Sequence, residues 1–490
     1  MSQHKIAANF LIQTSAKAIS VVLGLGMTVL LTRALQDANG GTALFGEYTT
    51  VIAFLQLFGV VVDLGLTLTL PAMLAECKNK EAEERLVGTA FWTRLFSSAV
   101  LFGCAPLLAL AINDWSSTVH SAVVVGAIAY TFMSGATVLI GVFQKYQQIW
   151  RASLAEVLSR IVLVVLTGIG VILGWQVIPF VAILIAANVV WLGLTLWFMR
   201  PIMTIRFGWS WFVCKAILAR SWPIALSICF NLIYLKTDIL FLSMFRSAEE
   251  VGLYGLAYRF LDVVTNIPVM YMGILLPALA ADWTRKAFTD VHKHIRITAS
   301  LFWIISVPLM VGTLLLSGPV LRLIGGEAYV PAAPMLQLLI LAVPALFLGG
   351  LFGHVIVALN KQRQMISRYG LVALMTVCGY LVFIPIYGAF GAAMMTLFSE
   401  FLVAFLAYRV ISGTTHVPLA WKIACKTGIA SLAMAGVIYG TLHVGFFTAV
   451  IAGSFTYLSC LWGMRVFSEE LISSVIPERL QWKRKRLAVL

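Results

Sequence analysis

Charged residues inside long apolar stretches are the residues of this sequence best suited to bind an ion or a ligand. The chain has 490 residues, of which 61% are hydrophobic and only 11% are charged. A charge at the centre of a membrane-spanning helix costs at least about 2.5 kcal/mol, so it usually contacts a partner, water or a ligand. Cations there attract phosphate groups, and carboxylates hold protons or cations. The candidates within predicted spans are Lys17, Asp63, Arg94, Arg160, Lys236, Asp238, Arg259, Asp262 and Glu400.

Polar residues also recur on single faces of three predicted helices. Residues spaced by three, four or seven positions lie on one side of a helix. Such faces must contact protein or water, and several of them together predict a hydrated central cavity. The three faces are Asn9, Gln13 and Lys17; Ser227, Asn231, Tyr234 and Asp238; and Arg259, Asp262 and Asn266.

Mutual neutralisation is the alternative role for these charges, and the sequence leaves both roles open. Similar depth or helical spacing permits four ion pairs: Asp238–Arg259, Lys236–Asp262, Lys17–Asp63 and Glu156–Arg160. Arg94 has no obvious local partner. Lys17 and Arg94 are therefore favoured as phosphate-binding cations. Glu400 is a candidate for proton or sodium coupling, with a helix–helix hydrogen bond as its structural alternative.

The sequence gives no sign of an enzyme. It contains no phosphate-binding loop of the nucleotide hydrolases. The histidines are isolated, and no cysteine falls in a metal-binding or redox pair. We predict no catalytic residue, no metal site and no cofactor.

Fourteen apolar stretches are long enough to cross a bilayer. They cover about 8–32, 44–70, 87–112, 119–142, 154–174, 177–198, 219–245, 252–276, 296–317, 333–358, 369–387, 389–409, 420–440 and 443–463. With the N-terminus inside, 26 of the 34 Lys and Arg residues fall in inside segments and 3 in outside loops. This asymmetry is typical of cytoplasmic loops and predicts that both termini are cytoplasmic. We therefore attribute the net charge of +14 to basic residues in cytoplasmic loops, where they set the topology and contact lipid headgroups, and not to nucleic-acid binding.

Two segments of the chain resemble each other without a gap. The stretch from Phe45 to Glu76 matches the stretch from Val251 to Asp282 at an offset of 206 residues, with Gly-x-Tyr near the start and Leu-Pro-Ala near the end of each. A fixed offset of this length indicates duplication. Parallel repeats predict two lobes related by an axis along the membrane normal.

The predicted fold is therefore an all-α polytopic membrane protein with about fourteen transmembrane helices in two pseudo-symmetric lobes. We predict an N-terminal lobe at 1–199 and an interfacial cytoplasmic linker at 200–218. A second lobe follows at 219–410, and two further helices with a basic tail occupy 411–490.

One stretch, Leu30–Leu66, resembles the N-terminal signature of bacterial polysaccharide flippases. The signature combines Arg33-Ala34-Leu35, Gly46 with Tyr48, and Asp63-Leu64-Gly65, and the second half resembles it at 237–245 and at Gly252 with Tyr254. Bacterial polysaccharide flippases are the Wzx-type O-antigen and exopolysaccharide transporters of the multidrug/oligosaccharidyl-lipid/polysaccharide (MOP) exporter superfamily. The turn at 36–44 is longer than the family pattern.

The resemblance implies a MATE-like fold and a transporter in the bacterial inner membrane. Its substrate would be an undecaprenyl-pyrophosphate-linked oligosaccharide, moved to the outer leaflet by alternating access, with membrane lipids and a polysaccharide polymerase as further partners. On this hypothesis the pyrophosphate or glycan contacts Lys17, Arg94, Lys236, Arg259, Asn9, Gln13 and Asn231, while Asp63, Asp238, Asp262 and Glu400 serve coupling or structural pairing.

Three other functions fit parts of the sequence. An ion-coupled multidrug or cation exporter of the same superfamily would need carboxylates and aromatic residues in its cavity. A membrane polysaccharide polymerase or ligase would carry a large outside loop, which the predicted topology lacks. A scaffold without transport activity would not need polar helix faces.

Overall fold

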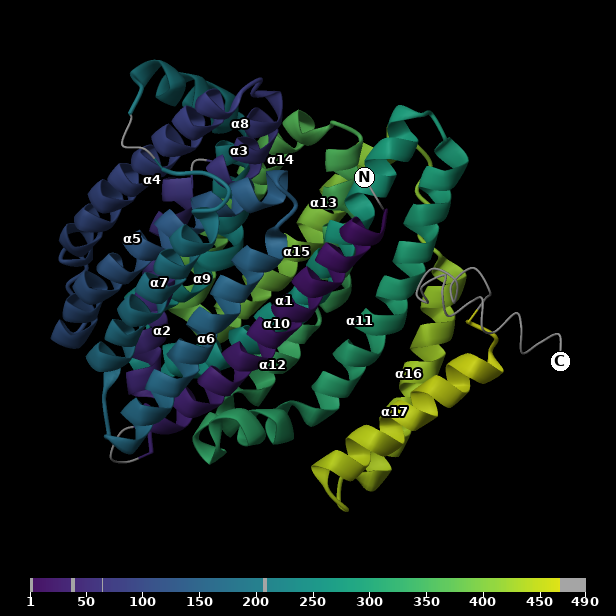
Figure 1. Ribbon diagram of the computed structural model, residues 1–490. Coiled ribbons are helices and arrows are strands. Elements are labelled where there is room, and N and C mark those ends of the chain that lie inside the picture. Colours follow the sequence, from purple (N-terminus) through teal and green to yellow (C-terminus); the bar gives the residue numbers. More distant parts are fainter. Residues whose placement is uncertain (1–2, 37–39, 64, 206–208, 468–490) are drawn as a thin grey trace. The chain divides into compact units, whose positions relative to one another are not determined.

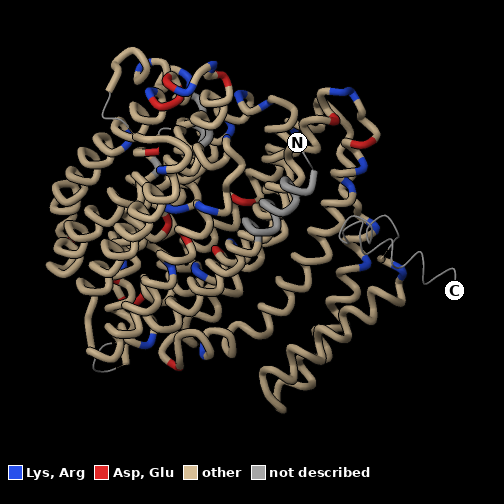
Figure 2. Tube along the Cα trace, viewed as in Figure 1, with Lys and Arg blue, Asp and Glu red and all other residues tan. Residues whose placement is uncertain are grey.

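The computed structural model describes residues 3–36, 40–63, 65–205 and 209–467, and every regular element in them is a helix (Figure 1). Twelve of these helices are long and apolar enough to cross a membrane, or thirteen if one bent pair counts as a span. Most of the trace is uncharged, and blue and red residues lie at the ends of helices and at several positions within them (Figure 2). The predicted class, an all-α polytopic membrane protein, is confirmed.

Short connections join the successive helices of the first half. They are α1 (Gln3–Ala34), α2 (Ala43–Asp63), α3 (Leu66–Glu76), α4 (Lys80–Ala109), α5 (Ser117–Lys145), α6 (Ile149–Ile172) and α7 (Val177–Met199). Side-chain caps fix two of their starts, because Asn79 accepts from the amide of Ala82 and Ser116 accepts from the amide of Val119.

The second half repeats this order with more breaks. Its elements are α8 (Trp211–Lys236), α9 (Asp238–Phe245), α10 (Ala248–Thr284), α11 (Phe288–Gly325), the 3-10 helix η1 (Glu327–Ala332), α12 (Ala333–Ile340), α13 (Val343–Ala358), α14 (Gln362–Tyr387) and α15 (Ala389–Ser412). Two more helices, α16 (Trp421–Thr441) and α17 (Phe446–Gly463), end the described chain.

Three predicted spans are interrupted. The span at 44–70 is divided where Gly65 takes the left-handed φ of 70°, which glycine adopts without steric cost. The span at 219–245 is divided between α8 and α9, and neither helix is among the twelve candidate spans. The span at 333–358 bends by 44°, with Pro344 in the first turn of α13.

The chain forms two compact units. The first contains residues 1–256, 324–329 and 369–395, and the second contains 257–323, 330–368 and 396–490. A core of the first unit joins Leu70, Leu86, Val142 and neighbouring apolar residues of α3, α4 and α5. A core of the second joins Met434, Ile438 and Tyr457 of α16 and α17. The lobes predicted at 1–199 and 219–410 remain a prediction.

Within the first unit, the duplicated segments touch each other at equivalent residues. A Cβ on Gly46 would lie 1.7 Å from the carbonyl oxygen of Ala248, and one on Gly252 would lie 2.3 Å from that of Thr42. Thr42 and Ala248 are themselves 206 residues apart, so the two contacts are the same contact made twice. Only glycine permits such an approach of two backbones. This reciprocity supports the duplication.

Candidate functional site

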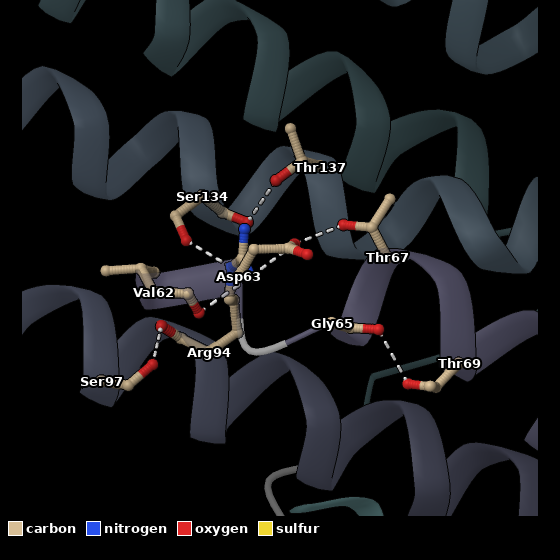
Figure 3. Close-up of polar contacts among 9 residues, drawn as sticks. All are labelled: Val62, Asp63, Gly65, Thr67, Thr69, Arg94, Ser97, Ser134 and Thr137. Atoms are coloured by element: carbon tan, nitrogen blue, oxygen red, sulfur yellow. Dashed lines mark hydrogen bonds and ion pairs between the residues drawn. The ribbon is translucent and has the colours of Figure 1, made fainter. Parts of the chain in front are cut away.

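A buried ion pair between Asp63 and Arg94 is the central polar feature of the first unit (Figure 3). Nη1 of Arg94 lies 2.7 Å from Oδ1 of Asp63, and the two side chains are 5% and 18% exposed. Nε donates to Oγ of Ser134 at 2.6 Å, and the hydroxyl of Thr67 donates to the same Asp63 oxygen at 2.5 Å. The pair therefore joins α2, α3, α4 and α5.

The break between α2 and α3 explains why an arginine is needed here. The last carbonyls of a helix have no partner within it. Nη1 of Arg94 donates to the carbonyl of Val62, in the last turn of α2, at 2.9 Å (Figure 3). At the start of α3, the hydroxyl of Thr69 donates at 3.0 Å to the carbonyl of the N-cap residue Gly65, which also accepts from the backbone amide of Thr69. Asp63 and Gly65 of the signature thus have structural roles, one as the anchor for Arg94 and the other as the left-handed turn.

Two predictions about this pair were wrong. Arg94 does have a partner, and Asp63 pairs with Arg94 in place of Lys17. The reason is tertiary: α2 and α4 pack against each other, which places residues 31 positions apart side by side. Contact of Arg94 with a substrate phosphate remains a prediction.

Lys17 and Arg160 are intramembrane cations of the first unit that have no protein partner among the described residues. Lys17 is exposed on α1, and Arg160 is partly buried on α6. The predicted Glu156–Arg160 pair is not among the ion pairs of the described residues, although i, i+4 spacing places both on one face of α6. The side chains of Asn9 and Gln13 lie outside the described part of the structure.

Asp238 is fully buried at the first turn of α9. Its Oδ2 accepts from the hydroxyl of Tyr254 at 2.7 Å, and its Oδ1 accepts from the amide of Ile239 at 2.9 Å. A carboxylate is favoured at a helix N-terminus by the exposed amides there. The amide of Asn231 donates to the hydroxyl of Tyr234 at 2.6 Å. The Tyr254–Asp238 bond connects α10 to α9, whereas the Asn231–Tyr234 bond lies within α8.

The predicted pairs Asp238–Arg259 and Lys236–Asp262 each join residues of different compact units, and they remain predictions. Within the second unit, the backbone carbonyl of Asp262 accepts from the amide of Asn266 at 2.7 Å.

Glu400 lies on α15 in the second unit and is only 5% exposed. Its Oε1 has no hydrogen-bond partner among the described residues. A buried carboxylate without partners is much more costly as the anion than as the acid. The role of Glu400 in proton or sodium coupling remains a prediction.

Acidic residues at the helix ends are paired with bases. Arg220 donates two bonds of 2.6 Å to Glu76, and this lowers the pKa of Glu76. Lys145 lies 2.6 Å from Glu83, and the hydroxyl of Tyr146 donates to Glu83 at 2.5 Å. That bond raises the pKa of Tyr146 to about 12. These ties hold α3 to α8 and α4 to α5.

A second set of contacts holds the turn between α14 and α15. Arg246 donates to the carbonyls of Ile384 and Pro385 at 3.3 and 2.8 Å, which are among the last carbonyls of α14. Glu250 accepts from the amide of Ala389, the first residue of α15, at 2.7 Å. Gly388 between them has a φ of +58°. The pair Arg246 and Glu250 thus caps two helix ends at once.

Sequence reasoning missed the partners of the buried charges. Ser134, Thr67 and Tyr254 are the residues concerned, and they are common residue types in membrane helices. The Gly-x-Tyr repeat was a signal for Tyr254, but its contact with Asp238 was not foreseen. Among the described residues, no group of histidine, cysteine, aspartate and glutamate side chains is arranged to hold a metal ion.

The charges and helix breaks described above are found in a chain whose sequence matches a known family. Residues 6–282, more than half of the chain, match the family model described as polysaccharide biosynthesis protein. The chain belongs to the polysaccharide biosynthesis protein family. A second model, MatE, matches residues 223–386 of this family member.

A curated relative of this polysaccharide biosynthesis family member is named "Probable flippase AglR" and comes from Haloferax volcanii. The two are 23% identical over 257 residues, which are 50% of this chain and 54% of AglR. The chain thus spans about half of the length of the curated relative that it matches.

Solved structures show the fold of this family member. The lipid II flippase MurJ in an inward closed conformation matches with a TM-score of 0.75 at 16% identity, over 92% of this chain and 98% of MurJ. An inward-facing MATE family transporter of the MOP superfamily matches with a TM-score of 0.67 at 12% identity, over 83% and 100%. The helices therefore adopt the MOP transporter fold that the resemblance implied.

Proposed function

We propose that this protein flips a lipid-linked oligosaccharide from the inner to the outer leaflet of a bacterial cytoplasmic membrane. The observation that carries the proposal is the match of residues 6–282 to the polysaccharide biosynthesis family, combined with the MOP transporter fold. A glycan and its phosphates cannot enter hydrocarbon without a polar path. Lys17, which has no partner in the described chain, supplies a positive group on a membrane helix for such a path.

The proposed substrate is a polysaccharide repeat unit linked to undecaprenyl pyrophosphate, used for O-antigen of lipopolysaccharide or for exopolysaccharide. Transport would proceed by alternating access through a polar, partly cationic central cavity. A polymerase acting on the flipped unit would be the next partner. Lys17 would bind the pyrophosphate, with Lys236 and Arg259 as further cations, and Asn9, Gln13 and Asn231 as hydrogen-bonding groups.

Coupling to a proton or sodium gradient is part of the proposal. Glu400 is the residue assigned to this step, because its Oε1 is buried without a partner among the described residues. The positive-inside asymmetry supports cytoplasmic termini.

Deletion of the gene, followed by analysis of lipid-linked glycans, tests the proposed function. Complete lipid-linked repeat units should accumulate in the inner leaflet, where an external label cannot reach them, and their mass would identify the sugar. Complementation by the intact gene is the control. Normal display of surface glycan in the deletion strain would contradict the proposal.

A multidrug or cation exporter is the second candidate, favoured by the match of residues 223–386 to the MatE model. The deletion strain distinguishes the two candidates. Normal surface glycan together with new sensitivity to cationic drugs would establish the exporter.

A further inference from the structure

A proline lies near the middle of α11, a helix of 38 residues. Pro308 has no backbone N–H, so the carbonyl of Ile304 loses the hydrogen bond that residue 308 would otherwise donate. A proline inside a helix also bends it, because its ring clashes with the preceding turn. α11 is a candidate membrane span, where a carbonyl without a partner is costly. The carbonyl of Ile304 therefore needs a donor from outside the helix.

Tyr457 of α17 supplies that donor. Its hydroxyl donates to the carbonyl of Ile304 at 2.7 Å. The side chain is only 6% exposed and belongs to the apolar core that α16 and α17 form with part of α11. Tyrosine suits this position because it combines a large apolar ring with one polar group. The hydroxyl thus replaces the bond within α11 that Pro308 removes.

The helices α16 and α17 lie beside α11 (Figure 1) and contact it on both sides of Pro308. Before the proline, the indole of Trp303 donates to the carbonyl of Leu419, just ahead of α16, at 2.9 Å. After the proline, a Cβ on Gly312 would lie 3.8 Å from Cε of Met434. Both segments of α11 therefore rest against the same pair of helices.

The contact made by Tyr457 is directional, whereas the core around it is not. Val311, Leu315 and Leu316 of α11 pack in that core through apolar groups. Apolar contacts depend on buried area and tolerate small shifts of a helix, whereas a hydrogen bond weakens steeply when its angle changes. The bond from Tyr457 therefore fixes the geometry of α11 at Pro308 more strictly than the apolar contacts do.

We infer that the α16–α17 pair controls the bend of α11 through the single hydrogen bond from Tyr457 to Ile304. Tyr457 is a positioning residue, because it acts on the geometry of α11 at Pro308. Release of this bond allows α11 to change its bend while the apolar contacts keep it packed on α16 and α17. The inference goes beyond the proposed function, since it concerns a conformational device of the second unit that does not depend on the substrate.

Hydrogen–deuterium exchange of the purified full-length protein in detergent tests the inference. Tyr457→Phe leaves the carbonyl of Ile304 without its donor, so the backbone amides of residues 300–312 should exchange about tenfold faster. Residues 314–323 and α16 should keep their exchange rates, because their apolar contacts remain. Unchanged exchange at 300–312 would overturn the inference. A uniform increase over the whole of α11 would also overturn it, because that is the effect of a contact that only adds stability.

A substitution at the proline shows whether the hydroxyl acts through Pro308. Pro308→Ala restores a backbone N–H that can donate to Ile304, so residues 300–312 should exchange more slowly than in the unmodified protein. Tyr457→Phe added to Pro308→Ala should then have little effect, because the carbonyl already has a donor. If Tyr457→Phe speeds exchange by the same factor with and without Pro308, the inference fails.

Two further variants are matched controls. Tyr439→Phe removes the same hydroxyl from a side chain of α16 that is 78% exposed, so exchange in α11 should not change. Pro319→Ala restores an N–H elsewhere in α11, so the effect of Tyr457→Phe should persist in that background. Loss of the effect with Pro319→Ala would contradict a role specific to Pro308. The unfolding temperature of each variant verifies that it is folded.

Discussion

Arg94 donates to a carboxylate, a hydroxyl and a backbone carbonyl, all on neighbouring helices. Arg94→Gln would leave Asp63 buried without its cation. Removal of one partner of a buried pair costs about 3–5 kcal/mol, and the partial exposure of Asp63 places the expected loss toward the lower end. A thermal unfolding series in detergent should therefore show a clearly lower transition temperature for this variant.

The double variant Arg94→Gln with Asp63→Asn is the control for this prediction. It removes both charges, so it should recover part of the stability that the single variant loses. An unchanged transition temperature in Arg94→Gln would contradict the structural role of the pair.

The hydroxyl of Tyr146, at the C-terminal end of α5, has a pKa that is raised by its contact with Glu83. Its bond to Glu83 raises the pKa to about 12, above the ordinary value of about 10. The folded state thus favours the protonated hydroxyl, and its contribution to stability is complete below pH about 10 and lost as the pH rises through about 12. Unfolding at pH 8 and pH 11 should show a smaller alkaline loss for Tyr146→Phe than for the unmodified protein. An equal alkaline loss in both would contradict this assignment.

At the scale of the elements, the turn between α14 and α15 depends on a glycine and on the side chain that covers it. Gly388 has a φ of +58°, and a Cβ there would lie 2.0 Å from Oε1 of Glu250. Gly388→Ala should therefore lose the roughly 1–2 kcal/mol of a left-handed alanine and also displace the helix cap. The measurement is the unfolding temperature.

Gly174→Ala is the matched control for the turn. Gly174 has a φ of +66°, and a Cβ added there would meet no described atom within 4 Å, so its replacement has only the conformational cost. Equal losses of stability in the two variants would show that the Glu250 cap contributes nothing.

The division of helices was only partly predictable from the sequence, and the reason is physical. Hydropathy locates apolar stretches, so the spans that became α4 to α7 were found. It does not detect a change of direction inside a stretch, and the breaks at Gly65 and at Thr237 were missed. Spacing reveals neighbours within one helix, which is why Glu156 was paired with Arg160. It could not reveal that Asp63 and Arg94 meet across two helices.

At the scale of the whole molecule, the contact between α2 and α10 joins the two duplicated segments. A Cβ on Gly255 would lie 3.3 Å from that of Thr49, close to the separation of about 3.5–4.5 Å found in disulfides. Cysteines at these two positions, in a chain whose native cysteines are replaced, should cross-link on oxidation. If the proposed alternating access separates these two segments, flipping should then stop on oxidation and return after reduction.

Each single-cysteine variant should remain active under oxidation, which controls for the substitutions themselves. A cross-linked protein that still flips its substrate would show that these segments stay together throughout transport.

The reciprocal approach of Gly46 to Ala248 and of Gly252 to Thr42 has a consequence for the origin of the chain. A surface that binds its own copy through the same residues on both sides is isologous, as at the interface of a two-fold symmetric homodimer. An ancestor of half the length could have made this contact between two identical subunits before their genes were joined. In such a homodimer, one mutation of the shared glycine would change both sides of the interface at once. In the fused chain, Gly46 and Gly252 can change independently.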